Sequence, residues 1–103
     1  MVLVNETFSV DINHSDDWIK WIQEQYIPAL VESKLLENCI LSRVQNSQIQ
    51  GAESFALQFV VTNESKLTIW KENLDPELKQ KLNAKFAGRY ASFQTFLNII
   101  SNH

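Results

Sequence analysis

The chain has 103 residues, of which 45% are hydrophobic and 20% are charged, and its net charge is −3. This length suits one domain over residues 1–103, and the composition is that of a folded chain and excludes a disordered one. A mildly acidic protein lacks the positive surface that nucleic acids and anionic membranes require. The single cysteine, Cys39, excludes an intrachain disulfide and lies in an apolar run, which predicts a buried thiol.

The first residues of the chain, Met1 to Glu6, contain no basic segment and no apolar stretch of signal-peptide length. No run approaches the roughly 18 apolar residues of a membrane-spanning helix. We therefore expect a cytoplasmic protein with no membrane partner.

The first segment alternates between apolar and polar residues from Val2 to Ile12, which predicts a half-buried strand. Glu6 interrupts the apolar face, and we expect it near an exposed strand end or a bulge. Cap and acidic residues from Asn13 to Asp17 then suit the start of a helix. Its apolar stripe predicts a helix from Trp18 to Ser33, with a kink near Pro28 because proline removes a backbone hydrogen bond.

The middle of the chain predicts a hairpin followed by a second helical region. Two strands are expected, from Asn38 to Asn46 and from Glu53 to Thr62, with a polar loop over Ser47 to Gly51 between them. Asn63 can cap the next helix. Asp75-Pro76 combines a cap residue with a proline, which predicts that a separate helix starts there.

The end of the chain predicts one more strand. Gly88 has the position of a helix C-terminus, and a strand is expected from Tyr90 to Ile100. We assign to its core face Ala91, Phe93, Leu97 and Ile99. The resulting order, β-α-β-β-α-β, predicts a ferredoxin-like α+β fold, in which a four-stranded antiparallel sheet has helices on one face.

The second face of this sheet should be too polar for another core and yet include large apolar groups. We assign to it Thr7, Ser9, Asp11, Leu41, Arg43, Gln58, Val60, Gln94, Phe96 and Asn98. Two interpretations fit this mixture. The face is solvated, or a second copy packs its own sheet against it and forms a dimeric barrel.

Several apolar motifs are similar to those of a known family. They are Trp18-x-x-Trp21, Tyr26-Ile27-Pro28, Arg43-Val44, and Phe86 with Phe93-Gln94-Thr95. Over nearly the whole chain the sequence resembles domain-of-unknown-function family 4286, a small bacterial group in the dimeric α/β-barrel superfamily. The resemblance implies the ferredoxin-like fold and a homodimer formed through the second sheet face. It implies no reaction, because fold does not determine function.

The chain departs from the family pattern at two positions. The family has a histidine before the Ile-Pro pair, where this chain has Tyr26. It also has a glycine after the first helix, near the position of Lys34. If the family histidine has a chemical role, this chain lacks it.

Two aromatic residues of the first helix are candidates for lining a ligand pocket. Tyr26 lies beside Pro28, and a kink of this kind can open a pocket between helix and sheet. The other interpretation is a core tyrosine whose hydroxyl bonds the backbone. Trp21 lies about 60° from the apolar stripe of its helix, so it either lines a groove or a partner surface or packs in the core.

Three polar residues of the predicted strands are further candidates. Arg43 could bind the carboxylate or phosphate of a small ligand, pair with Asp11 inside a barrel, or lie on an open face. Gln58 and Asn98 share the second sheet face with it and could position a ligand there.

Other familiar sites are disfavoured. His14 in a loop and His103 at the C-terminus lack the further ligands that a metal ion needs. The basic residues between Lys79 and Arg89 are explained by a solvated helix face. Two glycines do not make a phosphate-binding loop, and Phe55 and Phe59 belong to the core instead of an RNA-binding surface. We expect no metal, no cofactor and no nucleic-acid partner.

The sequence therefore favours a non-catalytic homodimeric domain that binds a small molecule or a protein partner. The alternative is a cofactor-independent oxygenase or isomerase of the dimeric-barrel type, acting on a small organic substrate. In such an enzyme Tyr26, Arg43, Gln58 and Asn98 would position the substrate. A third interpretation is a subunit that works with another protein, with Trp21 on the contact.

Overall fold

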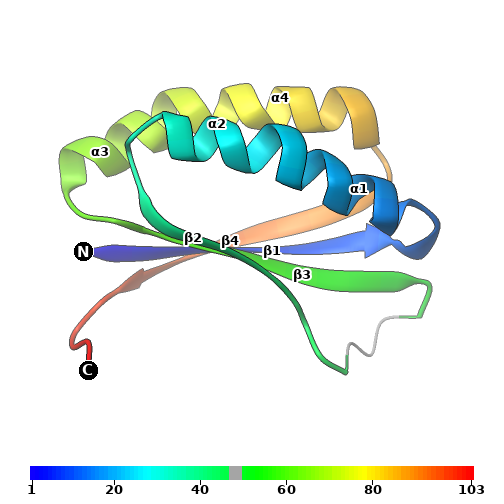
Figure 1. Cartoon of the computed structure of the whole chain (residues 1–103), viewed down its shortest axis with the longest axis horizontal. Coiled ribbons are helices and arrows are strands. Elements are labelled where there is room, and N and C mark those ends of the chain that lie inside the picture. The colour runs from blue at the N-terminus through cyan, green and yellow to red at the C-terminus, as the bar shows by residue number, and fades with distance from the viewer. Residues whose placement is uncertain (47–49) are drawn as a thin grey trace.

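The computed structural model describes residues 1–46 and 50–103, which form one antiparallel sheet with helices on one side (Figure 1). The four strands lie in the order β2-β3-β1-β4, which confirms the predicted ferredoxin-like α+β fold. Residues 47–49 of the predicted loop lie outside the described residues. In chain order the elements are β1 (Val2–Asp11), the 3₁₀ turn η1 (Ile12–His14), α1 (Ser15–Trp21), the π turn η2 (Ile22–Tyr26), α2 (Ile27–Glu32), β2 (Glu37–Arg43), β3 (Ala52–Val61), α3 (Glu64–Ile69), the π turn η3 (Trp70–Leu74), α4 (Asp75–Phe86) and β4 (Tyr90–Asn98).

Strand β1 lies in the interior of the sheet and pairs with β3 on one side and β4 on the other. Its side chains alternate as predicted, because the even-numbered residues from Val2 to Val10 are buried and the odd-numbered ones are half-buried. The expectation for Glu6 is wrong. This residue is in the middle of the strand, opposite Leu57 and Gln94, and is only 3% exposed.

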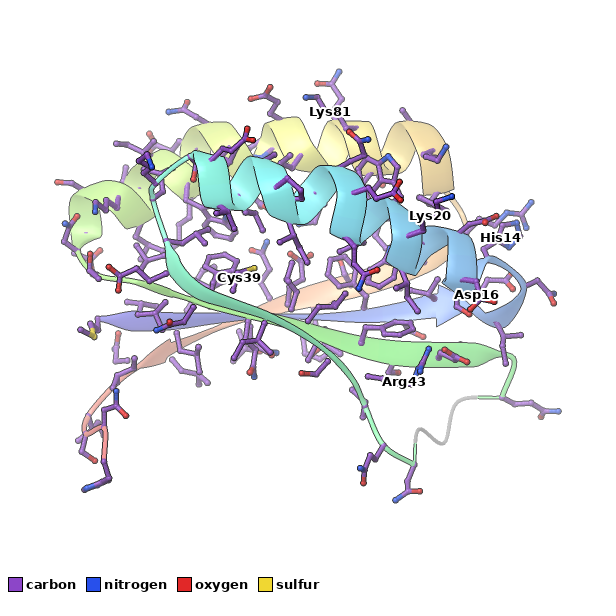
Figure 2. All side chains as sticks on the ribbon, in the orientation of Figure 1. His14, Asp16, Lys20, Cys39, Arg43 and Lys81 are labelled. Carbon is purple, nitrogen blue, oxygen red and sulfur yellow. The ribbon has the colours of Figure 1, made fainter. Side chains whose placement is uncertain are left out.

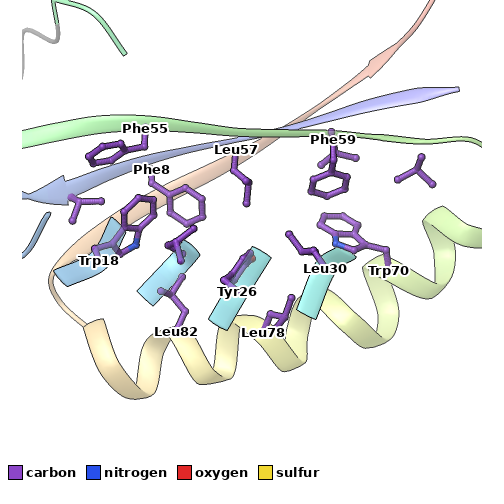
Figure 3. Packing of buried hydrophobic residues seen from close by; sticks show 14 of the residues in the cluster. Phe8, Trp18, Tyr26, Leu30, Phe55, Leu57, Phe59, Trp70, Leu78 and Leu82 are labelled. Carbon is purple, nitrogen blue, oxygen red and sulfur yellow. The ribbon is translucent and has the colours of Figure 1, made fainter. Parts of the chain in front are cut away.

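The core between sheet and helices is built largely from aromatic rings (Figure 3). At one end Trp18 stacks on Phe55 with ring centroids 4.9 Å apart and tilts against Phe8 at 5.0 Å. At the other end Trp70 meets Phe59 edge-on at 5.4 Å. Such aromatic pairs add about 0.5–1.5 kcal/mol each beyond the burial of their area. Each helical region is therefore fixed to the sheet by its own tryptophan.

The first helical region runs without a break from α1 through η2 into α2. In the π turn the N–H of Ile27 donates to the carbonyl of Ile22, five residues earlier. The turn lies directly before Pro28, which has no N–H and whose ring would clash with the carbonyl four residues earlier. The irregularity predicted at Pro28 is therefore a wide turn that ends just ahead of the proline.

The second helical region repeats this construction. Asn63 caps α3 as predicted, since its side-chain oxygen accepts from the N–H of Lys66 at 2.9 Å. A π turn again precedes a proline, and the N–H of Asp75 donates to the carbonyl of Trp70. The helix start predicted at Asp75-Pro76 is confirmed as the start of α4, but Asp75 does not act as a cap. Asp75 has helical backbone angles, and the wide turn lets the helix continue past Pro76.

The faces of strand β4 are the reverse of the prediction. Register with β1 places Gln94, Phe96 and Asn98 on the side of the helices, opposite the even-numbered residues of that strand. Phe93 and Leu97, which were predicted to be in the core, lie on the other face and are 62% and 46% exposed. Because β4 has large apolar residues at both odd and even positions, alternation alone does not decide which face is buried.

The faces of strand β2 also differ from the prediction. Its pairing with β3 shifts register between Glu37 and Ile40, and Asn38 within this irregularity has a positive φ of 56°. After the shift, Leu41 and Arg43 lie opposite core residues of β3 and therefore on the side of the helices. A bulge of this kind moves every later side chain to the other face, and the sequence pattern gave no sign of it.

Lys34 follows α2 with a φ of 61°, a left-handed conformation that glycine adopts without strain. Lys34→Gly should therefore raise the free energy of unfolding by roughly 0.5–1 kcal/mol in urea denaturation. Gly88→Ala is the matched control, because Gly88 has a φ of +78° and no neighbouring atom within 4 Å of an added Cβ. Gly88→Ala should lower the free energy of unfolding by a similar amount. A Lys34→Gly variant that is no more stable than the wild type would contradict strain at this position.

Candidate functional site

A polar cluster lies between the helices and the sheet, and it consists of Glu6, Tyr26, Asp75, Lys79 and Gln94. Lys79 is at its centre. Its Nζ donates to Glu6 Oε1 at 2.7 Å and to Asp75 Oδ1 at 2.8 Å. A third bond reaches Tyr26 Oη at 3.0 Å. These bonds use all three protons of the ammonium group.

Gln94 connects the two carboxylates of the cluster. Its Nε2 donates to Glu6 Oε1 at 3.3 Å and to Asp75 Oδ2 at 3.0 Å. The side chain of Glu6 is 4% exposed, whereas those of Lys79 and Asp75 are 19% and 17% exposed. The cluster thus joins β1, β4 and both helical regions, and solvent reaches it mainly from the side of α4.

Burial and charge together determine the protonation of the cluster. Burial raises the pKa of the Tyr26 hydroxyl, and it does so more strongly than the nearby Lys79 ammonium lowers it. Burial alone would lower the pKa of Lys79, but its interactions with Tyr26, Glu6 and Asp75 outweigh that effect and raise it. The tyrosine is therefore neutral and the lysine charged at ordinary pH.

Lys79→Met should lower the free energy of unfolding by about 3–5 kcal/mol, because it leaves the Glu6 carboxylate buried without its cation. Urea denaturation measures the loss. Glu6→Leu combined with Lys79→Met should recover most of it, because the buried carboxylate is then removed together with its cation. The carboxylate that remains, Asp75, is 17% exposed and still accepts from Gln94. Lys81→Met is the control: Lys81 pairs with Glu77 at 3.7 Å on the surface, and its loss should cost less than about 1 kcal/mol. A single Lys79→Met variant as stable as wild type would contradict this assignment.

Stability should fall as the pH rises above about 10. An unfolded tyrosine loses its proton near about pH 10 and an unfolded lysine near about 10.4. The raised pKa values keep these protons on Tyr26 and Lys79 in the folded state. Above about pH 10 the unfolded state therefore binds fewer protons, and the free energy of unfolding decreases with pH.

Thermal unfolding at several pH values between about 8 and 11 measures this decrease. Tyr26→Phe removes one of the two groups and should make it less steep. A midpoint temperature that stays constant through this range would show that neither group holds its proton more tightly when folded.

A groove, called here the helix groove, lies between α1 with η2 and the neighbouring α4. Its wider part has a volume of about 560 Å³ and is lined by Trp21 and Phe86 and by charged residues on its two sides. A second part of about 420 Å³ continues along α4 and shares Trp21 and Gln25 with the first. Both volumes lie in the range of small-molecule sites, about 300–1,000 Å³.

The sheet face away from the helices, called here the open face, has no helix packed on it (Figure 1). The central residues of this face are uncharged, and they are Leu3, Asn5, Thr7 and Ser9 of β1, Ile40 and Ser42 of β2, Ala56, Gln58 and Val60 of β3, and Ala91, Phe93, Thr95 and Leu97 of β4. The register also places Asp11, Ala52 and Ser54 at one end of the face and Glu37 at the other, so its charged residues lie at its ends. Its large apolar side chains are accessible, and Ile40 and Phe93 are 55% and 62% exposed.

The polar residues at the centre of the open face bond to one another. Asn5 Nδ2 donates to Thr7 Oγ1 at 3.1 Å, and Gln58 Nε2 donates to Asn5 Oδ1 at 3.1 Å. Their amide and hydroxyl groups are therefore partly satisfied before any partner covers them.

The structure does not bring the predicted pocket residues together. Tyr26 belongs to the polar cluster and bonds a lysine instead of the backbone, and Trp21 lines the helix groove. Gln58 lies on the open face, and Asn98 is exposed at the end of β4 on the side of the helices. These four residues therefore lie in four separate environments.

Arg43 differs most from its predicted environment. It lies on the outer strand β2, with Nε 3.3 Å from Glu53 Oε2 and the guanidinium 5.5 Å from the ring centre of Phe55 (labelled in Figure 2). The pair with Asp11, one of the three alternatives for Arg43, does not form: Arg43 pairs with Glu53, and Asp11 on β1 accepts from the N–H of Asn13. The Arg43 side chain is 60% exposed, so it is not a buried barrel residue.

The sequence analysis missed Glu6, Asp75 and Lys79 as members of a common site. Two signals were present. Glu6 interrupts an otherwise apolar strand face, and Asp75 with Lys79 has the i,i+4 spacing of a helical ion pair beside the apolar stripe. Nothing in the sequence joins these signals, because Glu6 and Lys79 are separated by 73 residues.

Two further expectations concern metals and membranes. Within residues 1–46 and 50–103, no three His, Cys, Asp or Glu side chains are grouped so that they could hold a metal ion. No helix in that part of the chain has the length and apolar character needed to cross a membrane. Cys39 is half-buried, and burial raises the pKa of its thiol.

Comparison with known proteins identifies a family and a fold. The family profile of DUF4286, a domain of unknown function, matches residues 1–100. No curated protein matches the sequence. A dimeric ferredoxin-like protein from an uncultured marine organism shares 15% identity and a TM-score of 0.71, over 100% of this chain and 98% of the other.

Two further solved structures share this architecture. An antibiotic biosynthesis monooxygenase has 13% identity and a TM-score of 0.71, over 98% of this chain and 100% of its own. An ethyl tert-butyl ether d (EthD) family protein from Bacillus halodurans has 7% identity and a TM-score of 0.64, over 92% of this chain and 97% of its own. At these identities the similarity establishes the fold and leaves the function open.

Proposed function

This chain belongs to the DUF4286 family, and we propose that it is a homodimeric binding domain whose two copies pack open face against open face. The observation that carries this proposal is the absence of formal charge from the thirteen central positions of the open face, in a chain with 20% charged residues. The charged residues of this face, Asp11 and Glu37, lie at its ends. Depletion of charge distinguishes the centre of a protein interface from ordinary surface.

The size of the open face supports a stable pair. Strands β1 and β3 are each ten residues long. With about 3.3 Å per residue and about 4.8 Å between strands, four strands cover roughly 600 Å² in projection. Side chains enlarge the accessible area beyond this projection, toward the roughly 800 Å² per partner that specific interfaces bury.

The chemistry of the open face also suits a two-fold pair. In such a pair the same patch meets itself, so a patch with an uncharged centre avoids the repulsion between like charges that a charged centre would create. The exposed rings of Phe93 and the side chains of Ile40 and Leu97 supply apolar area, and the bonded Asn5, Thr7 and Gln58 reduce the cost of burying polar groups.

Binding is favoured over catalysis because the groups best suited to chemistry already bond one another. All three protons of Lys79 are donated to cluster members, and Gln94 links both carboxylates. The oxygenase or isomerase alternative would have to use this cluster, which contains the perturbed Tyr26 and Lys79. It is ranked second because Lys79 lines neither part of the helix groove.

Native mass spectrometry of the wild-type protein at micromolar concentration should give the mass of a dimer. Phe93→Asp should give a monomer, because each two-fold pair would bury two new carboxylates, which should weaken dimerisation by about 100-fold or more. Val31→Asp is the matched control, since Val31 is a 53% exposed apolar residue on helix α2. It should remain a dimer.

Two results would contradict the proposed pair. A wild-type protein that stays monomeric at high concentration would remove it, and so would a Val31→Asp variant that dissociates as readily as Phe93→Asp. Circular dichroism of each variant establishes that the fold is retained.

A further inference from the structure

We propose that the helix groove binds a small aromatic molecule that carries both a carboxylate and an ammonium group. This inference names a ligand for the proposed binding domain and to that extent rests on it. The groove is on the side of the helices, whereas the proposed dimer contact is on the opposite face of the sheet (Figure 1). The two can therefore be tested separately.

The centre of the groove is a supported aromatic surface. Trp21 lines both parts of the groove and is half-buried. Its ring centroid is 6.1 Å from that of Tyr26 and 6.1 Å from that of Phe86, and both neighbours are buried. An indole held by two core rings keeps its orientation, so its free side can stack on a planar ring without a large loss of side-chain entropy.

Charges of both signs surround this aromatic surface. Asp17, Lys20 and Glu24 lie on α1 and η2, and Lys85 lies on α4 across the groove. Although these four residues line one groove, the described residues form no ion pair that involves any of them. They remain available to a ligand.

This arrangement favours a ligand with two opposite charges. An aromatic carboxylate without an ammonium group would meet Asp17 and Glu24 as well as the lysines, and an aromatic amine without a carboxylate would meet Lys20 and Lys85. A ligand with both groups can pair each charge with an opposite one while its ring lies on Trp21. Aromatic amino acids are the simplest molecules of this class.

The position of the basic residues is consistent with a ligand that lies along the groove. Figure 2 shows Lys20 and His14 at the same end of the helix pair, with Lys81 farther along α4. His14 lines the wider part, with Nδ1 3.7 Å from Asp11 Oδ2, and Lys81 lines the continuation. Because the groove is open to solvent, the dissociation constant should be on the order of 1 mM for a molecule of this size.

The test is NMR titration of the ¹⁵N-labelled full chain with unlabelled L-tryptophan, indole-3-acetate and tryptamine. The indole N–H signal of Trp21 reports on the groove, and it is identified as the signal missing from the Trp21→Phe variant. We expect this signal to shift and saturate with L-tryptophan. We expect affinity to fall at least about threefold for both analogues, because each lacks one of the two charges.

Variants test which side chains hold the charges. Lys20→Ala together with Lys85→Ala should weaken the binding of L-tryptophan and leave that of tryptamine unchanged or stronger. Lys66→Ala on α3, outside the groove, is the control and should bind as the wild type does. The proposal is overturned if the Trp21 signal does not shift, if either analogue binds as tightly as L-tryptophan, or if the double variant binds it unchanged.

The oligomeric state is measured in the same samples. A monomer that binds L-tryptophan would contradict the proposed dimer and support this site. A dimer that does not bind L-tryptophan would contradict this site and support the proposed dimer.

Discussion

The contact between Glu6 and Lys79 constrains the rest of the structure. Glu6 is in the middle of an interior strand, where neighbouring strands occupy both backbone edges and the helices cover its side chain. An ionised carboxylate in this position needs a cation close by, because its desolvation costs several kcal/mol. Among the residues that the structure describes, Lys79 of α4 supplies it, with Nζ at 2.7 Å. That requirement fixes how α4 lies over the sheet, and Asp75 and Tyr26 then surround the same ammonium group.

The two π turns explain how both helical regions keep one face on the sheet. Buried residues of the first region recur every four positions, at Trp18, Ile22, Tyr26 and Leu30. In a regular α-helix this spacing drifts by about 40° at each step, because a turn has about 3.6 residues. A π turn has more residues per turn than an α-helix, so it rotates the buried residues back toward the sheet. The same reasoning applies to the second region, where Trp70 and Leu78 are eight residues apart across η3. Tyr26 ends one π turn and Asp75 follows the other, so both reach the polar cluster.

The sequence predicted what depends on local pattern and failed where distant contacts decide. Burial alternates along β1 and along β3 from Phe55 to Val61, and apart from Glu6 the buried faces of these strands were predicted correctly. Strand β4 has apolar residues on both faces, and its orientation depends on Gln94 meeting Glu6 and Phe96 meeting Trp70. The spacing of four in the helices was visible, but it was interpreted as an α-helical stripe with a kink. For Trp21 two alternatives were predicted, a residue that lines a groove or a partner surface and a residue of the core. Both apply in part, because Trp21 packs on Phe86 and Tyr26 and also lines the groove.

The sheet separates the two proposed surfaces and determines how they could influence each other. In a pair formed through the open faces, the helices of both copies point outward, so both helix grooves remain accessible. A connection does exist from one surface to the other, through Trp21, Tyr26, Lys79 and Glu6 to β1. Coupling between sites requires an element with two arrangements that both sites bias. Here the first step is a ring contact between Trp21 and the buried Tyr26, and the other steps are hydrogen bonds from Lys79, all of whose protons are donated. These contacts favour one arrangement. We therefore expect the two grooves of a pair to bind independently of each other.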